Sequence, residues 1–82
     1  MWFVYVLKSL KDGRYYIGST SNLEKRVERH NHGGNISTKN RRPLELVYFE
    51  TYNTRVDAIH REAVIKSYKG GEAFEKLVKL RR

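Results

Sequence analysis

The order of apolar and polar positions along this chain of 82 residues predicts a small sheet with helices packed on it. Residues 2–7 are apolar almost throughout, a pattern typical of a strand that is covered on both faces. The dipeptide Asp12-Gly13 tolerates the positive backbone angles of a tight turn, so residues 14–18 are predicted to return beside the first strand. A third strand is predicted over residues 44–52.

The predicted hairpin also decides which side chains share a face of the sheet. With a two-residue turn at Asp12-Gly13, the residue numbers of any two directly paired residues add up to an odd number. The residue numbers of Tyr5 and Tyr16 also add up to an odd number, although these two residues are not directly paired. These two tyrosines are therefore expected on one face. The other face is expected to carry Val4, Val6, Tyr15 and Ile17. In the third strand the same alternation separates Leu44, Leu46 and Tyr48 from Glu45, Val47 and Phe49.

Helix starts are predicted from capping residues. Ser21 and Glu24 form a capping-box pattern for a first helix, and Thr54 with Asp57 opens a second one, which runs to residue 68. A third helix is predicted over residues 72–80. The side chains expected to face the core are Leu23, Val27 and His30, then Ala58, Ile59, Ala63 and Ile65, and finally Phe74, Leu77 and Val78.

These elements define the predicted fold class. It is α+β, a small three-stranded antiparallel sheet flanked by about three helices in the order β-β-α-β-α-α. A chain this short has room for one core, so residues 1–82 are expected to form a single domain. The polar, basic loop over residues 31–43 is expected to add nothing to that core.

Charge points to the class of partner. Lys and Arg number 17 against 9 Asp and Glu, which gives a formal net charge of +8. Because the basic residues are interleaved with aromatic ones, nucleic acid is the expected partner. The chain has no cysteine, which excludes disulfides, thiol nucleophiles and thiolate metal sites and agrees with a cytoplasmic location. No apolar run approaches the ~20 residues of a membrane span, so no membrane association is expected.

Two charged residues are candidates for chemistry. Glu62 borders the apolar stripe of the second helix, and a lone carboxylate can anchor one divalent cation when water and a substrate phosphate complete the shell. The alternative interpretation is that Glu62 forms a solvated ion pair with Lys66. Arg26, one turn into the first helix, offers a planar fork of donors suited to phosphate. The alternative interpretation is that Arg26 is an ordinary exposed arginine.

The tyrosines and His30 have similar pairs of interpretations. Tyr5 and Tyr16 are either packing residues or phenols that act on a substrate, and a phenol becomes a base near neutral pH only where cations lower its pKa of about 10. His30 could orient a phenol or accept its proton, or it is a half-buried packing residue. No metal-spaced histidine pair is present, so zinc is not expected. The residues expected to contact nucleic acid are Lys8, Arg14, Arg29, Lys39, Arg41 and Arg42.

Four segments, taken in order, resemble the motifs of the GIY-YIG nuclease superfamily: Val4-Tyr5-Val6, Tyr16-Ile17-Gly18-Ser19, Leu23-Glu24-Lys25-Arg26 with His30, and Arg61-Glu62-Ala63-Val64-Ile65-Lys66. Thr38 together with residues 42–48 is similar to the compact stand-alone branch of that superfamily, which is related to the nuclease module of UvrC-type excision proteins. Each motif is weak alone, and the ordered set covers nearly the whole chain.

The resemblance implies a metal-dependent DNA endonuclease that hydrolyses phosphodiester bonds with little sequence specificity. Glu62 would hold a single Mg²⁺ or Mn²⁺, and Arg26 would bind the scissile phosphate. Tyr5 and Tyr16 would flank that phosphate, one of them activating or positioning the attacking water, and His30 would assist them. The DNA could be nicked, branched or single-stranded.

Two departures keep alternatives open. The first motif lacks its usual glycine and isoleucine, and residues 69–74 and the helix that follows lack the asparagine that many members carry near the active site. The first alternative is a non-catalytic nucleic-acid-binding module on the same fold. The second is an interaction domain whose charge attracts an acidic protein.

Overall fold

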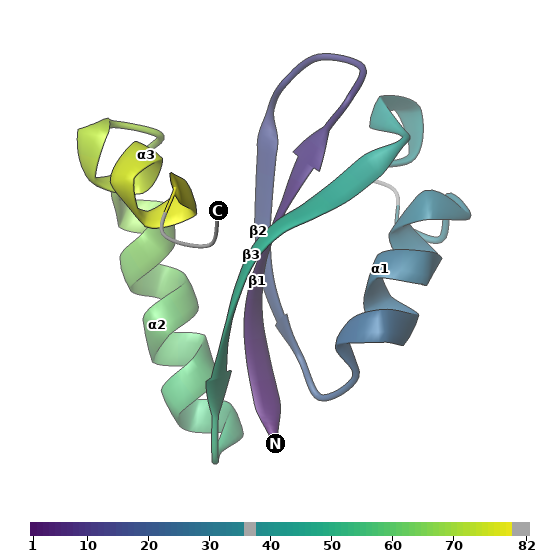
Figure 1. Ribbon diagram of the computed structural model, residues 1–82. Coiled ribbons are helices and arrows are strands. Elements are labelled where there is room, and N and C mark those ends of the chain that lie inside the picture. The colour runs from purple at the N-terminus through teal and green to yellow at the C-terminus, as the bar shows by residue number, and fades with distance from the viewer. Residues whose placement is uncertain (36–37, 80–82) are drawn as a thin grey trace.

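A computed structural model describes residues 1–35 and 38–79 of the chain. The order of elements confirms the predicted α+β class (Figure 1). The elements are β1 (Trp2–Ser9), β2 (Tyr15–Thr20), α1 (Leu23–Asn31), the short 3-10 helix η1 (Lys39–Arg41), β3 (Leu44–Tyr52), α2 (Arg55–Ser67) and α3 (Glu72–Lys79). Leu80, the predicted last residue of the third helix, lies outside the described residues.

The sheet is antiparallel and its strand order is β2-β1-β3, so the apolar strand β1 lies in the centre. Helices α2 and α3 cover one face, and α1 covers part of the other (Figure 1). This confirms that β1 is covered on both faces, and its residues 4–7 are all buried. Apolar burial on both sides of one strand is what stabilises so small a sheet.

The hairpin turn differs from the predicted one. Ser9 N donates to Arg14 O at 2.8 Å, so the turn contains residues 10–13 instead of the Asp12-Gly13 pair alone. Leu7 pairs with Tyr16, and the register sum stays odd despite the longer turn. The prediction that Tyr5 and Tyr16 share a face is therefore confirmed. Val4, Val6, Tyr15 and Ile17 pack on the opposite face, as predicted.

The predicted alternation along β3 is wrong, because the strand contains a bulge. Tyr48 pairs with Val6 but Leu46 pairs with Leu7, which leaves Val47 as an extra residue. The bulge reverses the alternation from that point on. Leu44, Leu46 and Phe49 consequently pack on the α1 side, whereas Val47 and Tyr48 pack on the α2 side.

The cap of α2 was predicted correctly and that of α1 was not. Thr54 Oγ1 accepts a hydrogen bond from Asp57 N at 3.2 Å and begins α2. At α1 the cap is Asn22, whose side chain accepts from Lys25 N at 3.1 Å, and the predicted cap Ser21 is exposed. The shift by one residue follows from β2, which continues to Thr20 instead of ending at the glycine.

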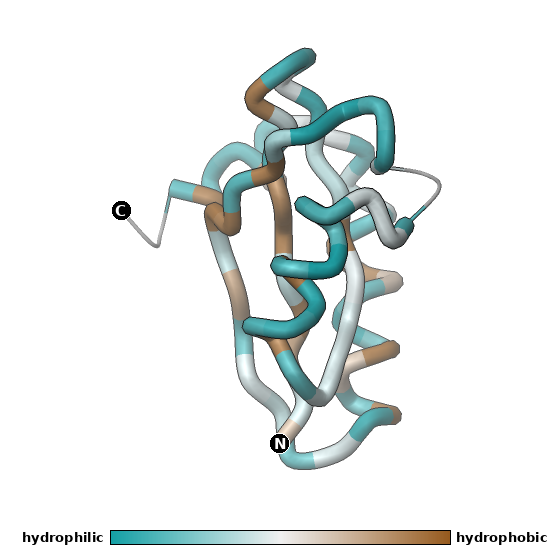
Figure 2. The backbone as a smooth tube through the Cα atoms, turned by 90° about the vertical axis from the view of Figure 1, so that its right-hand side faces the viewer, coloured by the Kyte–Doolittle hydropathy of each residue, from teal (hydrophilic) through white to brown (hydrophobic). Residues whose placement is uncertain are grey.

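The helices contribute unequally to the core. Ala58 and Ile65 of α2 are buried, but Ile59 and Ala63 are exposed, contrary to prediction, because they lie on the opposite side of the helix. Phe74 and Leu77 of α3 are buried as expected. Helix α1 is almost entirely hydrophilic where it crosses in front of the sheet (Figure 2). Among residues 1–35 and 38–79, no helix has the length and apolar content that crossing a membrane requires.

Candidate active site

A polar pocket of about 350 Å³ lies along the edge strand β2, between α1 and α2. It collects the five residues that the sequence suggested for chemistry, although they come from four different elements. Its lining consists of Tyr5, Tyr16, Ile17, Gly18, Ser19, Arg26, His30, Asn35, Thr38 and Glu62. Two phenols, a guanidinium, an imidazole and a carboxylate therefore share one small surface.

Tyr5 reaches this pocket because the residue opposite it on β2 is Gly18. A methyl group added at Gly18 would lie 2.6 Å from Tyr5 Cζ and closer still to the hydroxyl oxygen. The absence of a side chain at Gly18 thus leaves the space that the phenol fills. The Tyr5 side chain is 3 % exposed, and its hydroxyl lies 3.3 Å from Nε2 of His30.

Burial keeps both members of this pair neutral near pH 7. Burial raises the pKa of Tyr5, and it outweighs the hydrogen bond and the positive charge of Arg26, which lower it. Burial also lowers the pKa of His30, and the positive charges of Arg26 and Arg29 lower it further. The second ring nitrogen of His30, Nδ1, lies 2.8 Å from the hydroxyl of Thr38.

The hydroxyl of Tyr16 is held by Arg41, a residue of the short helix η1. Arg41 Nη1 of η1 donates a hydrogen bond to the Tyr16 hydroxyl, and the guanidinium carbon lies 5.7 Å from the ring centroid. Arg41 Nε also lies 3.6 Å from a carboxylate oxygen of Asp12. Arg41 was predicted to contact nucleic acid, and in this structure its charge is shared with Asp12 while it orients a phenol.

Glu62 enters the pocket from α2, on the opposite side of β2. Ser19 Oγ donates to Glu62 Oε1 at 2.8 Å, and Lys66 Nζ lies 2.7 Å from Oε2. The Lys66 side chain is 55 % exposed, whereas that of Glu62 is 19 % exposed. The more exposed member of the pair is therefore the lysine, and Glu62 is also held by Ser19.

The donor set at Glu62 fits one hard divalent cation. One carboxylate, a hydroxyl and open space for water are what Mg²⁺ accepts, since it retains several waters in protein sites. Within residues 1–35 and 38–79, no three His, Cys, Asp or Glu side chains form a group that could hold a metal ion. A two-metal site or a zinc site would need such a group.

The remaining basic residues are spread over several surfaces. Arg14 lies beside Lys66 and Lys69, next to the Glu62 side of the pocket. Arg42 Nε donates to Lys39 O at 2.7 Å in the loop before β3. The Arg29 side chain packs against Gly34, and Lys39 is exposed. Lys8 lies over the Tyr15 ring on the α3 face, near Glu45 and Glu75, and not beside the pocket.

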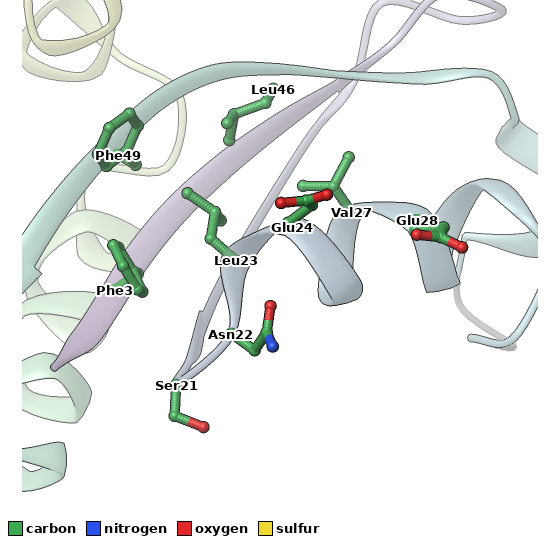
Figure 3. Close-up of a pocket in the computed structure, with 9 residues that line it drawn as sticks. All are labelled: Phe3, Ser21, Asn22, Leu23, Glu24, Val27, Glu28, Leu46 and Phe49. Carbon is green, nitrogen blue, oxygen red and sulfur yellow. The ribbon is translucent and has the colours of Figure 1, made fainter.

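A larger pocket, of about 680 Å³, lies on the other side of α1 and has a different character. Figure 3 shows Phe3, Leu46 and Phe49 of the sheet and Leu23 and Val27 of α1 directed into it. Its charged members are the carboxylates Glu24 and Glu28. An apolar groove beside two acidic side chains repels phosphate, so the smaller polar pocket is the candidate active site.

Several pocket residues escaped the sequence reasoning. Ser19 belongs to a recognised motif, but its bond to Glu62 depends on a helix 43 residues away along the chain. Thr38 and Asn35 come from the loop that was expected to stay outside the core, and Thr38 is fully buried. Thr38 is part of the resemblance to the stand-alone branch, but that resemblance implied no role for its hydroxyl.

Comparison with known proteins gives consistent matches along the chain. The family model of the GIY-YIG catalytic domain matches residues 1–76. UPF0213 proteins of Staphylococcus epidermidis and Staphylococcus aureus are 49% and 48% identical to this chain over 67 residues, 80% of this chain and 80% of theirs. The solution NMR structure of a UPF0213 protein from Bacillus halodurans covers 99% of this chain and 86% of its own, with 31% identity and a TM-score of 0.61.

Proposed function

We propose, from the premise that this chain belongs to the GIY-YIG catalytic-domain family, that it is a metal-dependent endonuclease acting on DNA. Family membership supports a nuclease-type function. The observation that carries the finer proposal is the convergence of Tyr5, Tyr16, Arg26, His30 and Glu62 on one polar pocket. The reaction is hydrolysis of a phosphodiester bond, with little selection among base sequences.

Glu62 is the residue that would hold the metal ion. A bound Mg²⁺ or Mn²⁺ supplies a positive charge that polarises a phosphoryl oxygen and lowers the pKa of bound water. Ser19 keeps one oxygen of Glu62 directed into the pocket. Lys66 neutralises the carboxylate, and its exposed ammonium can turn outward when a cation takes its place.

Arg26 binds the scissile phosphate in this proposal. Its guanidinium lines the same pocket as Tyr5, and its positive charge lowers the pKa of that phenol. A planar guanidinium can donate two parallel hydrogen bonds to phosphate oxygens. These bonds strengthen as negative charge grows on the phosphoryl group, which is how a fixed donor lowers a reaction barrier.

The tyrosines position the nucleophile. Tyr5 is neutral near pH 7 because burial raises its pKa, so its hydroxyl can hold a water and pass on a proton only if His30 accepts one. Tyr16, held by Arg41, lines the same pocket. A water held between them can approach the phosphorus in line with the leaving oxygen.

Affinity for DNA would come from the phosphate backbone. The net charge of +8 and the basic residues Arg14, Arg29, Lys39, Arg41 and Arg42 favour contacts that carry no sequence information. Selection among substrates would then depend on DNA shape, as in nicked, flapped, branched or single-stranded forms.

The proposal is tested by cleavage of labelled linear, nicked, flapped, branched and single-stranded DNA with Mg²⁺ or Mn²⁺. The expected result is metal-dependent cutting that Glu62→Ala abolishes without unfolding the chain. Glu72→Ala is the matched control, since Glu72 forms the same i,i+4 pair with Lys76 at 3.3 Å on an exposed helix surface. Cutting that survives in Glu62→Ala would refute the proposed role.

A non-catalytic nucleic-acid-binding module is the second candidate. It is favoured by the ion pair of Glu62 with Lys66 and by the lack of an asparagine in residues 69–74. Binding that weakens steeply with salt, without product from any DNA form, would support this candidate against the nuclease.

A further inference from the structure

Thr38 is a buried hydroxyl for which the proposed function has no use. It is 0 % exposed, although it lies in a polar and basic loop. Its Oγ1 lies 2.8 Å from His30 Nδ1 and donates to the carbonyl oxygen of Asn35 at 3.5 Å. The backbone N–H of Thr38 donates to the same carbonyl at 3.2 Å, which fixes the residue relative to Asn35.

One assignment of protons satisfies every member of this group. A hydroxyl has one proton, and the Asn35 carbonyl oxygen, 3.5 Å from Thr38 Oγ1, is an acceptor for it. With its proton directed to Asn35, the Thr38 oxygen acts as an acceptor toward His30, and Nδ1 of His30 then carries the ring proton. A neutral imidazole has a single N–H, which leaves Nε2 with a free lone pair 3.3 Å from the hydroxyl of Tyr5. Burial and the nearby arginines lower the pKa of His30 and favour this neutral form.

We propose that Thr38 is a positioning residue that fixes His30 in the tautomer protonated on Nδ1, so that the hydroxyl of Tyr5 donates its proton to Nε2. A hydrogen bond on one ring nitrogen commonly decides the state of the other. In the opposite tautomer Nε2–H would donate to the Tyr5 oxygen and could not receive a proton from it. Thr38 touches no reacting atom and acts only through His30.

The catalytic consequence rests on the proposed function. As water attacks the phosphorus, one of its O–H bonds breaks and the proton passes to the Tyr5 oxygen, while the Tyr5 hydroxyl proton passes to Nε2. The water oxygen forms the new P–O bond with its lone pair, the bond to the leaving oxygen breaks, and that oxygen takes a proton from solvent. His30 becomes an imidazolium, and its Nδ1–H remains hydrogen-bonded to the Thr38 oxygen. Tyr5 begins and ends as a neutral phenol.

The tautomer is measured directly on the full chain, without substrate. Nitrogen-15 NMR of the imidazole side chains distinguishes a protonated ring nitrogen from a bare one, and assignment uses His30→Gln. The expected wild-type result is a proton on Nδ1 and a bare Nε2. A proton on Nε2 in the wild type would overturn the proposal. Because this measurement uses the wild-type chain alone, it does not depend on whether a Thr38 variant folds.

Two substitutions separate the hydroxyl from the shape of the side chain. Thr38→Val keeps the branched shape but removes the acceptor, so His30 is expected to shift toward protonation on Nε2. Thr38→Ser keeps the hydroxyl and is expected to retain the wild-type tautomer. If Thr38→Val leaves the proton on Nδ1, Thr38 does not set the tautomer.

Cleavage kinetics give the second readout. Loss of the proton acceptor is expected to lower kcat by about 10²-fold in Thr38→Val with KM little changed, and Thr38→Ser is expected to restore the rate. A wild-type kcat in Thr38→Val would contradict the catalytic part of the inference. If the wild-type protein cuts no DNA, the proposed function fails while the NMR result still decides the role of Thr38.

Discussion

Gly18→Ala tests whether the phenol of Tyr5 must lie where the structure has it. The new methyl carbon would stand 2.6 Å from Tyr5 Cζ, whereas ordinary contacts of this kind begin at 3.4 Å. The ring must therefore move by at least about 0.8 Å, the difference between those two distances. It is packed among buried side chains and its hydroxyl lies 3.3 Å from His30 Nε2, so a displacement of this size changes the geometry of that bond.

The expected cost has two parts. Overpacking a core in this way destabilises a protein by about 1–3 kcal/mol. Misplacement of a reacting group by about 1 Å lowers the rate by about 10²-fold. Urea unfolding at pH 7 measures the first part, and single-turnover cleavage of DNA measures the second part on the folded fraction.

Gly71→Ala is the matched control. An added Cβ at Gly71 meets only the Tyr68 carbonyl oxygen at 3.4 Å, an ordinary contact, and Gly71 is not among the glycines with positive φ. Its free energy of unfolding is expected within about 0.5 kcal/mol of wild type, with an unchanged rate. If Gly18→Ala cleaves as fast as Gly71→Ala, the position of the Tyr5 hydroxyl has no part in the chemistry.

Three further predictions concern the guanidinium of the pocket and a polar cluster under α2. Arg26→Lys should lower kcat by about 10²-fold, because an ammonium cannot form two parallel bonds to phosphate, and steady-state kinetics at wild-type rate would contradict this. Burial raises the pKa of Glu50, but hydrogen bonds from Arg61, Tyr48 and Tyr52 outweigh it and hold the pKa below its usual value. The contribution of Glu50 to stability is therefore complete above the pKa of an unfolded glutamate, about 4.3, and is lost in acid, so Glu50→Gln should be less stable than wild type in urea at pH 7 and this difference should shrink as the pH falls. Burial and the Glu50 carboxylate raise the pKa of Tyr48 to about 12, so stability should fall as pH rises from about 10 through that value, and Tyr48→Phe should reduce this alkaline loss.

The cluster around Glu50 also bears on the active site. Arg61 binds the carboxylate of Glu50 with Nε at 2.8 Å and Nη2 at 3.0 Å, and this joins α2 to β3. Glu62 is the next residue along α2. The bidentate bond thus fixes the rotation of the helix that directs Glu62 into the pocket.

The sequence was sufficient to predict which side chains share a face of the sheet where the alternating pattern tolerates small changes in the turn. The turn of the first hairpin is longer than predicted, yet Tyr5 and Tyr16 share a face because only an odd change in register would separate them. Along β3, one extra residue at Val47 did change the parity, and the predicted orientation of Tyr48 and Phe49 failed. Nothing in the local sequence marks that bulge, because it depends on how β3 pairs with β1.

The candidate site was predicted only in part, because some of its contacts also depend on how distant segments pack together. Its motif residues could be matched to a family as an ordered set, but the groups that hold them come from distant parts of the chain. Ser19 reaches Glu62 and Thr38 reaches His30 only after the strands and helices have packed. The cap of α1 is Asn22, one residue after the predicted Ser21, and it follows a strand β2 that runs two residues past Gly18.

The most direct test of the account is single-turnover cleavage of labelled branched and nicked DNA, started by adding Mg²⁺ to the preformed complex of protein and DNA. Wild type is compared with Glu62→Gln, which keeps the shape of the side chain and removes its charge. The account predicts cutting by wild type after metal addition and a loss of at least about 10²-fold in the variant, with DNA binding retained. Equal cutting by both proteins, or cutting that continues after chelation of the metal, would contradict the assignment of Glu62 and of the pocket around it.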